Sequence, residues 1–269
     1  MGVPVVQTIP RRTLLEAILS VAFVPLVLRP SASRLFAQPA SAARRGRILV
    51  FDVNETLLDI AALAPRFVQI FGTANVLPEW FSNVVLYSQV TTIAGPYVDF
   101  GTVARASLQM TASAHGITLA KTDEDDVIRG LVSLPAHPDV RAGLDALRTA
   151  GFRLVTLTNS APAAVEQQLK NAGIDEYFER RFSVDAVRQF KPAPGVYRLV
   201  ATELGVDVSQ LRLVAAHAWD VMGALRAGCV AAFVARPGKA LYPLAEKPDV
   251  IGSDLRLVAE QIIKKDTAR

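Results

Sequence analysis

Short runs of consecutive apolar residues recur along the chain and alternate with segments of helical periodicity. The apolar runs predict buried strands, which lie over residues 47–52, 152–158, 211–216 and 230–234, with a weaker one over 181–184. Helical patterns that stop at a glycine follow three of these runs, over residues 163–172, 194–204 and 219–227. This alternation predicts an α/β fold with a mainly parallel, Rossmann-like sheet.

The stretch between the first two predicted strands shows helical periodicity and no convincing strand. Its clearest helical patterns cover residues 105–115 and 123–132. Because a helical block of this size is too long for a single crossover, we expect residues 61–136 to form an inserted cap domain. The catalytic core would then comprise residues 43–60 and 137–269, and a helix over residues 139–150 would return the chain to it.

The N-terminal segment has the pattern of an export signal. The pair Arg11-Arg12 precedes a largely apolar run that continues to Leu28, and the small residues Ala40-Ser41-Ala42 follow. The paired arginines resemble a twin-arginine signal, so we expect residues 1–42 to direct the protein to the periplasm. The run is short and interrupted, and we expect no stable membrane insertion after cleavage. An uncleaved anchor or a misassigned start codon would give the same pattern.

The charge of the chain excludes one class of partner. The formal net charge is +4, but residues 43–269 contain 25 basic and 24 acidic residues, and no basic stripe is interleaved with aromatic residues. We therefore expect no nucleic-acid partner. The single cysteine, Cys229, excludes an intrachain disulfide and any metal site built from several cysteines.

Polar residues at the ends of the predicted strands are the candidates for chemistry, because reactive groups in such sheets lie past the carboxyl ends of the strands. Asp52 ends the first strand, and Thr56 follows four residues later. A carboxylate in this place can attack carbon or phosphorus and form an intermediate that water then cleaves. Thr56 could hold the loop by a hydrogen bond. The simpler alternative is a turn rich in Asp and Asn.

Three further strand ends or helix starts carry polar residues. Thr158 and Asn159 could bind a substrate oxyanion, although Thr-Asn-Ser is also common in turns. Lys191 precedes Pro192 and a predicted helix, from which Tyr197 could face the same pocket or belong to the core. Asp220, after the 211–216 run, could orient or deprotonate a water molecule.

These motifs, in this order from Arg47 onward, resemble the haloacid dehalogenase superfamily. Three segments, 97–100, 184–192 and 218–224, resemble the type II (S)-2-haloacid dehalogenases in particular. The resemblance implies that Asp52 displaces halide from C2 of a 2-haloalkanoic acid with inversion. Water then cleaves the aspartyl ester to release a 2-hydroxy acid. It further implies that Lys191 balances charge, that Thr158 and Asn159 hold the substrate carboxylate, and that the substrate is the small-molecule partner.

Two positions argue against the phosphatases of the same superfamily. Where those enzymes carry a general acid, this chain has Asn54, which cannot transfer a proton in that role and which we assign to substrate binding. Where they carry an acidic residue that helps to hold Mg²⁺, it has Ala216. We therefore expect no metal and no cofactor. A Mg²⁺-dependent phosphatase or phosphonate hydrolase and a non-catalytic exported binding protein remain the alternatives.

The chain also departs from the 2-haloacid dehalogenases at two positions. Phe81, after Trp80, stands where a halide-binding arginine is expected, and His217 stands where those enzymes have Asn. Phe81, Phe100 and Trp219 could form an apolar halogen pocket, and core packing is the alternative for each of them. Our hypothesis for the second position is that His217 and Glu55 form an acid–base pair that activates the hydrolytic water. The alternative is that Glu55 points to solvent and His217 binds a loop carbonyl. The resemblance also allows a homodimer, for which no sequence feature gives an interface.

Overall fold

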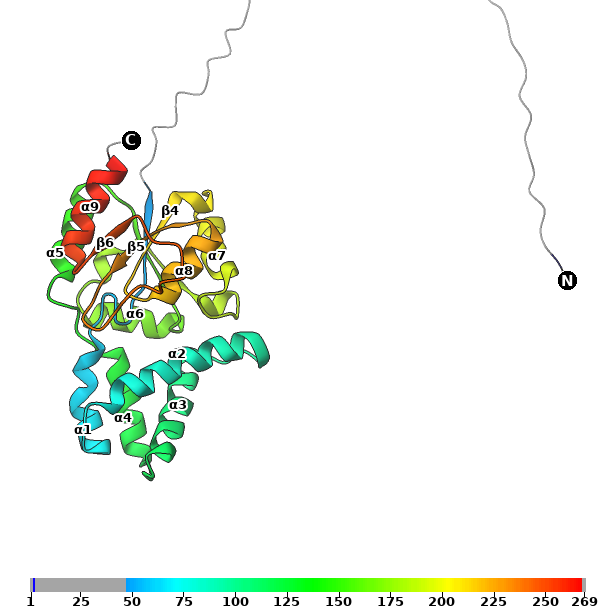
Figure 1. The fold of residues 1–269 in the computed structure, drawn as a ribbon, viewed down its shortest axis with the longest axis vertical. Coiled ribbons are helices and arrows are strands. Elements are labelled where there is room, and N and C mark those ends of the chain that lie inside the picture. Colours follow the sequence, from blue (N-terminus) through cyan, green and yellow to red (C-terminus); the bar gives the residue numbers. More distant parts are fainter. Residues whose placement is uncertain (1, 3–46, 268–269) are drawn as a thin grey trace, which may run out of the picture. The chain divides into compact units, whose positions relative to one another are not determined.

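The computed structural model describes residue 2 and residues 47–267 of the chain (Figure 1). The export signal expected over residues 1–42 therefore lies outside the described residues, apart from Gly2. Within residues 47–267, no single helix is long and apolar enough to cross a membrane. The bent pair Ile60–Phe71 and Val76–Ala94 meets that test only when its two parts are taken together.

The core is a six-stranded parallel sheet with the order β3-β2-β1-β4-β5-β6. Its strands are β1 (Ile48–Phe51), β2 (Leu154–Thr158), β3 (Arg180–Ser183), β4 (Leu211–Ala215), β5 (Val230–Val234) and β6 (Val250–Gly252). The predicted fold class is thus confirmed. Sequence analysis missed β6, because a three-residue strand is too short to show a pattern. β1 lies between β2 and β4, which places its carboxyl end at the middle of the sheet.

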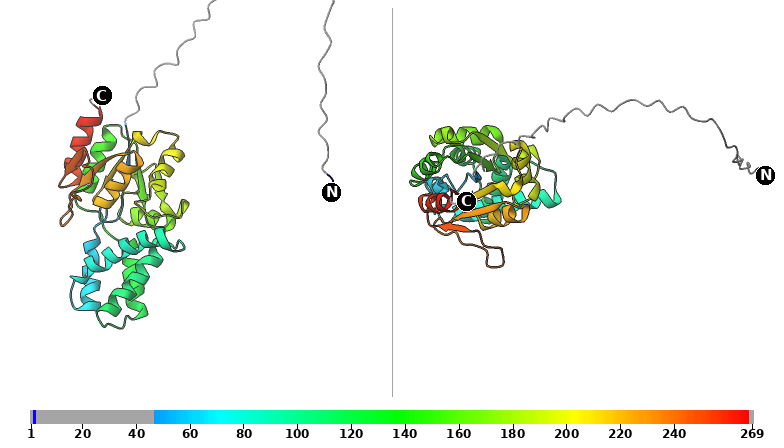
Figure 2. Two further views of the ribbon diagram at one scale, coloured as in Figure 1. Left: turned by 45° about the vertical axis from the view of Figure 1, so that its right-hand side comes forward. Right: turned by 90° about the horizontal axis from the view of Figure 1, so that it is seen from above.

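Helices cover both faces of this sheet, which explains why its central strands β1, β2 and β4 are buried along their whole length. They are α5 (Val140–Thr149), α6 (Pro162–Asn171), α7 (Pro194–Leu204), α8 (Ala218–Ala227) and α9 (Leu255–Thr267). α5 packs against α9, and α7 packs against α8 on the other side of the sheet (Figures 1 and 2). Single 3-10 turns complete the core at Asp175–Tyr177, Val184–Ala186 and Val208–Gln210.

Four helices and a 3-10 turn between β1 and α5 form the inserted helical cap that the sequence predicted. They are η1 (Ile60–Leu63), α1 (Ala64–Phe71), α2 (Val76–Ala94), α3 (Phe100–Ala114) and α4 (Lys121–Val132). The cap lies beyond the carboxyl ends of the strands (Figure 1). We propose residues 61–136 as its limits.

The cap also contacts the core loop that carries Lys191. The ring of Phe190 packs against Tyr97 and Phe100 of the cap, with centroids 5.0 and 6.1 Å away. The backbone N–H of Phe190 donates to the hydroxyl of Thr92 at 2.9 Å, and the Tyr97 hydroxyl donates to Asp185. The cap is therefore tied to the residue that immediately precedes Lys191.

Candidate active site

The loop after β1 places Asp52 at the carboxyl edge of the sheet, next to the loop after β4. The Thr56 hydroxyl donates to Oδ2 of Asp52 at 2.6 Å. The same hydroxyl accepts the backbone N–H of Ala216 at 2.9 Å. Thr56 therefore joins the two loops and holds the Asp52 carboxylate in one orientation.

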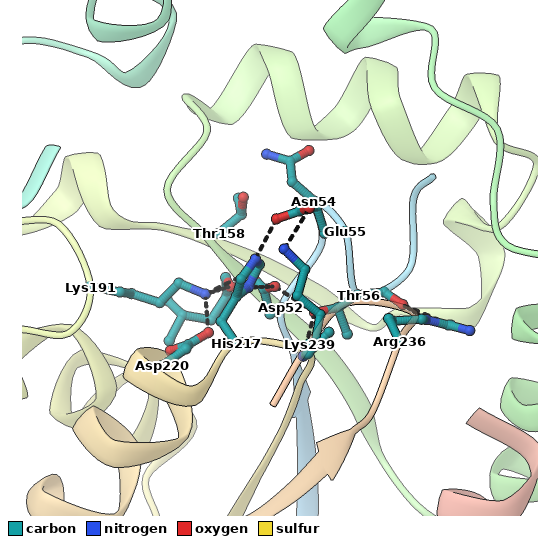
Figure 3. A network of polar contacts seen from close by, with 12 residues as sticks. Asp52, Asn54, Glu55, Thr56, Thr158, Lys191, His217, Asp220, Arg236 and Lys239 are labelled. Atoms are coloured by element: carbon teal, nitrogen blue, oxygen red, sulfur yellow. Dashed lines mark hydrogen bonds and ion pairs between the residues drawn. The ribbon is translucent and has the colours of Figure 1, made fainter. Parts of the chain in front are cut away.

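Lys191 lies between two buried carboxylates (Figure 3). Its ammonium donates to Oδ1 of Asp52 at 2.7 Å, to Oδ2 of Asp220 at 2.6 Å and to the carbonyl oxygen of Leu157 at 3.1 Å. Burial alone would lower the pKa of Lys191, but the charges of Asp220 and Asp52 raise it above its ordinary value. Lys191 is therefore an ammonium that balances both carboxylates.

The electrostatic surroundings keep Asp52 ionised. Burial alone would raise the pKa of Asp52, but the charge of Lys191 and the hydrogen bond and charge of His217 outweigh it. The pKa of Asp52 is therefore far below its usual range. An ionised carboxylate with fixed donors around it is the form that a nucleophile requires.

Both carboxylate oxygens of Asp220 accept a hydrogen bond. Lys191 binds one, and the Tyr197 hydroxyl donates to the other at 2.6 Å. Gly223 permits this approach, because a Cβ atom there would lie 2.5 Å from Pro192 and 2.6 Å from the Tyr197 hydroxyl. Asp220 is fully buried. This geometry favours Asp220 as an anchor for Lys191 over a group that contacts water.

His217 and Glu55, which the sequence suggested as a pair, are in direct contact. Nδ1 of His217 lies 3.1 Å from Oδ2 of Asp52, and Nε2 lies 2.8 Å from Oε2 of Glu55. Burial alone would lower the pKa of His217, but the bonds to Asp52 and Glu55 raise it to about 9. Because each ring nitrogen faces a carboxylate, His217 is an imidazolium in the resting enzyme.

Glu55 is held in an uncommon backbone conformation. Its φ of 61° lies in the left-handed region, which residues other than glycine rarely adopt. Oε1 of Glu55 forms an ion pair with Nζ of Lys239 at 2.7 Å. Strained residues of this kind cluster at functional sites, which is consistent with a chemical role for Glu55.

The residues proposed for the substrate carboxylate lie close to Lys191. Oδ1 of Asn159 accepts the backbone N–H of Lys191 at 3.1 Å, and the Thr158 hydroxyl accepts that of Ser160 at 3.1 Å. Neither bond uses the hydroxyl proton of Thr158 or the amide protons of Asn159. Asn54 differs, because its amide group already contacts Ser160 and Gln168.

A cavity of about 720 Å³ lies beside these residues, between α2 and the core loops. Phe81 and Trp219 line it, as do Glu55 and His217. The ring of Trp219 stacks on that of His217 with centroids 4.9 Å apart. The other residues expected at the substrate do not line this cavity, namely Asn54, Thr158, Asn159, Phe100 and Tyr197. Phe100 packs against Phe190, and the Tyr197 hydroxyl donates to Asp220.

The loop after β5 contributes residues that the sequence analysis missed. Arg236 donates to the carbonyl oxygen of Thr56 at 2.9 Å and to Asp139 at 2.6 Å, so it supports the nucleophile loop. Lys239 pairs with Glu55. His137, from the start of the returning segment, contacts the carbonyl oxygen of Glu55 at 3.2 Å. Arg236 and Lys239 follow the carboxyl end of the strand predicted over residues 230–234, and this position is the sequence signal that indicates them.

The donors around Asp52 offer no ready cation site. Within residues 47–267, no three His, Cys, Asp or Glu residues are grouped as metal ligands. The Lys191 ammonium bridges Asp52 and Asp220, so a cation of the protein itself lies between these two carboxylates.

Comparison with known proteins agrees with this geometry. The family model described as haloacid dehalogenase-like hydrolase matches residues 47–228. The chain is 30% identical to (S)-2-haloacid dehalogenase 2 of a Pseudomonas species (strain CBS-3), over 78% of this chain and 92% of that one. It is also similar to the L-2-haloacid dehalogenase of Xanthobacter autotrophicus with chloropropionic acid covalently bound. That structure is 26% identical, with a TM-score of 0.75 over 80% of this chain and 98% of that one.

A phosphatase shares the fold more distantly. The predicted phosphoglycolate phosphatase of Haemophilus somnus is 20% identical with a TM-score of 0.55, over 80% of this chain and 97% of that one. This similarity concerns the fold alone.

Proposed function

Because the chain belongs to the haloacid dehalogenase-like hydrolases, we propose that Asp52 is the nucleophile of a hydrolytic 2-haloacid dehalogenation. The enzyme is a hydrolase that acts on carbon–halide bonds and converts 2-haloalkanoic acids to 2-hydroxy acids. The observation that carries the assignment of the nucleophile is the buried, ionised carboxylate of Asp52, held by Lys191, Thr56 and His217.

In the first step, an Asp52 carboxylate oxygen forms a bond to C2 of the substrate while the carbon–halogen bond breaks. The halide leaves with the bonding electron pair, and C2 is inverted. No proton is needed at the leaving group, because halides are weak bases, and this agrees with Asn54 in place of an acid. Thr158 and Asn159 would donate hydrogen bonds to the substrate carboxylate. Phe81 and Trp219 would contact the halogen.

In the second step, water must attack the carbonyl carbon of the Asp52 ester. Ester formation removes the charge of Asp52, one of the two carboxylates that favour the imidazolium of His217. The pKa of His217 then falls, and the ring can lose a proton. The neutral ring, oriented by Glu55, accepts a proton from water. The bond between the Asp52 carbonyl carbon and the substrate oxygen breaks, and the departing oxygen takes this proton back from His217.

Halide release tests this function. The protein is incubated with racemic 2-chloropropionate and EDTA beside an Asp52→Asn variant. Chloride from the parent protein and none from the variant are expected. A protein that releases no halide but hydrolyses phosphate esters once Mg²⁺ is added would belong with the phosphatases. Equilibrium binding of the haloacid without halide release would indicate a binding protein.

The raised pKa of His217 predicts a pH dependence of stability. A free histidine has a pKa of 6.5, and in the folded protein it is about 9. The stabilisation is therefore fully present below 6.5 and is lost as the pH rises through about 9. We expect the melting temperature to fall over this window in the parent protein and to change less in His217→Asn. Equal slopes for the two proteins would contradict the assigned charge.

Lys239 is expected to tune the same pair. Burial alone would raise the pKa of Glu55, whereas its bond to His217 and the charges of His217 and Lys239 lower it. Without Lys239, the uncompensated Glu55 would favour the imidazolium, so ester hydrolysis would require higher pH. Lys239→Met should lower turnover roughly two- to threefold near neutral pH, and most of the loss should disappear at alkaline pH. Lys239→Arg should restore the parent pH profile, and a pH-independent loss would argue against this role.

We also propose that residues 1–42 act as a twin-arginine export signal and that the mature enzyme is periplasmic. Arg11-Arg12 and the apolar run after it support this proposal. Changing both arginines to lysine should retain the protein in the cytoplasm of an expressing bacterium. Unchanged fractionation of that variant would contradict the proposal. A homodimer is a further proposal, which the mass of the protein in solution would test.

A further inference from the structure

The cavity beside the active site has an apolar wall formed by one face of α2. Four residues of this helix line it at near-helical spacing: Leu77, Phe81, Val85 and Leu86. Ile60, Pro237 and Trp219 contribute further apolar surface from the surrounding loops. The wall therefore suits a hydrocarbon group better than a hydrated one.

The cavity reaches the reacting centre through His217. This residue lines the cavity and also lies 3.1 Å from the Asp52 carboxylate. In Figure 3, Lys191 and Lys239 flank Asp52, and Thr158 and Glu55 lie above it in the view, with Thr158 toward Lys191 and Glu55 toward Lys239. With its carboxylate near Thr158 and C2 at Asp52, a substrate would direct its substituent past His217 and into the cavity.

The volume exceeds what a small acid needs. Cavities of about 300–1,000 Å³ commonly hold drug-sized ligands, and this one measures about 720 Å³. A short acid such as 2-chloropropionate would leave most of the α2 wall in contact with water. A longer hydrocarbon substituent would cover it.

The charged residues of the cavity already have partners in the protein. Lys239 pairs with Glu55, Arg236 pairs with Asp139, and the Asp59 carboxylate accepts the backbone N–H of Ala61 at 2.9 Å. A second charged group on the substrate would have to compete with these pairs. An apolar substituent requires no such exchange.

We propose that the preferred substrates are 2-haloacids whose C2 carries a long or bulky apolar substituent, which extends beyond the halogen site at Phe81 and lies against Leu77, Val85 and Leu86 of α2. This inference rests on the proposed dehalogenase function and specifies its substrate class. Leu77 and Phe81 also belong to the buried core, whereas Val85 is half-buried and Leu86 is exposed, so a substrate group would cover the outer part of this face.

The test is a substrate series of 2-chloropropionate, 2-chlorobutyrate and 2-chlorohexanoate, with 2-chloro-3-phenylpropionate as a bulky member. The kcat/KM for halide release should rise along the alkyl series, by up to about fourfold for each added methylene that becomes buried. Val85→Trp would fill part of the cavity, so the ratio of kcat/KM for chlorohexanoate to that for chloropropionate should fall at least about tenfold. Leu86→Trp, at an exposed position of the same wall, gives a second reading if Val85→Trp folds poorly.

Val90→Trp is the matched control. Val90 lies on α2, is 39% exposed and does not line the cavity, so this variant should keep the parent ratio. If kcat/KM in the parent protein stays flat or falls as the alkyl chain lengthens, the inference is overturned while the dehalogenase function stands. The same holds if neither Val85→Trp nor Leu86→Trp changes the ratio of kcat/KM for chlorohexanoate to that for chloropropionate. Absence of halide release from every substrate would instead overturn the proposed function, and this inference with it.

Discussion

Lys191→Met is expected to slow halide release by about 10²- to 10³-fold, the usual effect of removing one preorganised charged donor from an active site. Lys191 touches the carboxylates of Asp52 and Asp220 and is itself 1% exposed. Without it, two buried negative charges would face each other, and one of them would take up a proton. Single-turnover measurement of chloride release would report the loss at the alkylation step.

The same substitution should also destabilise the fold. Removing one partner of a buried ion pair typically costs about 3–5 kcal/mol of unfolding free energy, because the remaining charge stays desolvated. Lys170→Met is the matched control, since Lys170 is an exposed lysine on α6. This control should change neither rate nor stability. Halide release at the parent rate by a folded Lys191→Met protein would exclude a role for this ammonium in the first step.

His217→Asn should separate the two chemical steps. Alkylation of Asp52 needs no base, so the variant should still release about one chloride per active site. Hydrolysis of the ester does need a base, so steady-state turnover should fall by about 10²- to 10⁴-fold. Intact-protein mass spectrometry should then show the 2-carboxyalkyl group on the enzyme, and peptide mapping should locate it at Asp52.

His115→Asn provides the comparison for this variant. His115 pairs with Glu79 in the cap, outside the cavity, so its replacement should leave turnover unchanged. Full turnover by His217→Asn would remove His217 from the hydrolytic step. Loss of even the first chloride would instead assign His217 to alkylation.

The residues that the sequence located most reliably are those at the ends of apolar runs. Asp52, Asn159 and Lys191 lie together because the loops that follow parallel strands meet at one edge of the sheet, so order along the chain largely determines position in space. The contact between His217 and Glu55 was also anticipated, since both residues lie on loops that follow central strands. Motif spacing therefore carried much of the information about the centre of the site.

The sequence did not predict which neighbours the side chains near the site contact. Tyr197 is on a correctly predicted helix, but its hydroxyl donates to Asp220 and does not line the cavity. Phe100 begins α3 and packs on the loop that precedes Lys191. Both are aromatic residues near the site, and periodicity alone does not state which neighbour an aromatic ring contacts. Lys239 lies in the loop after β5, which has no periodic pattern, and it pairs with Glu55 on the distant loop after β1.

The path of oxygen from water tests the central claim, covalent catalysis by Asp52, most directly. Excess enzyme is allowed one turnover of 2-chloropropionate in H₂¹⁸O, and both lactate and the Asp52 peptide are analysed by mass spectrometry. Since water attacks the carbonyl carbon of the ester, the account predicts ¹⁸O in the Asp52 carboxylate and unlabelled lactate. Label in the lactate hydroxyl with none in Asp52 would show that water attacks C2 directly, and would contradict the assignment of Asp52 as the nucleophile.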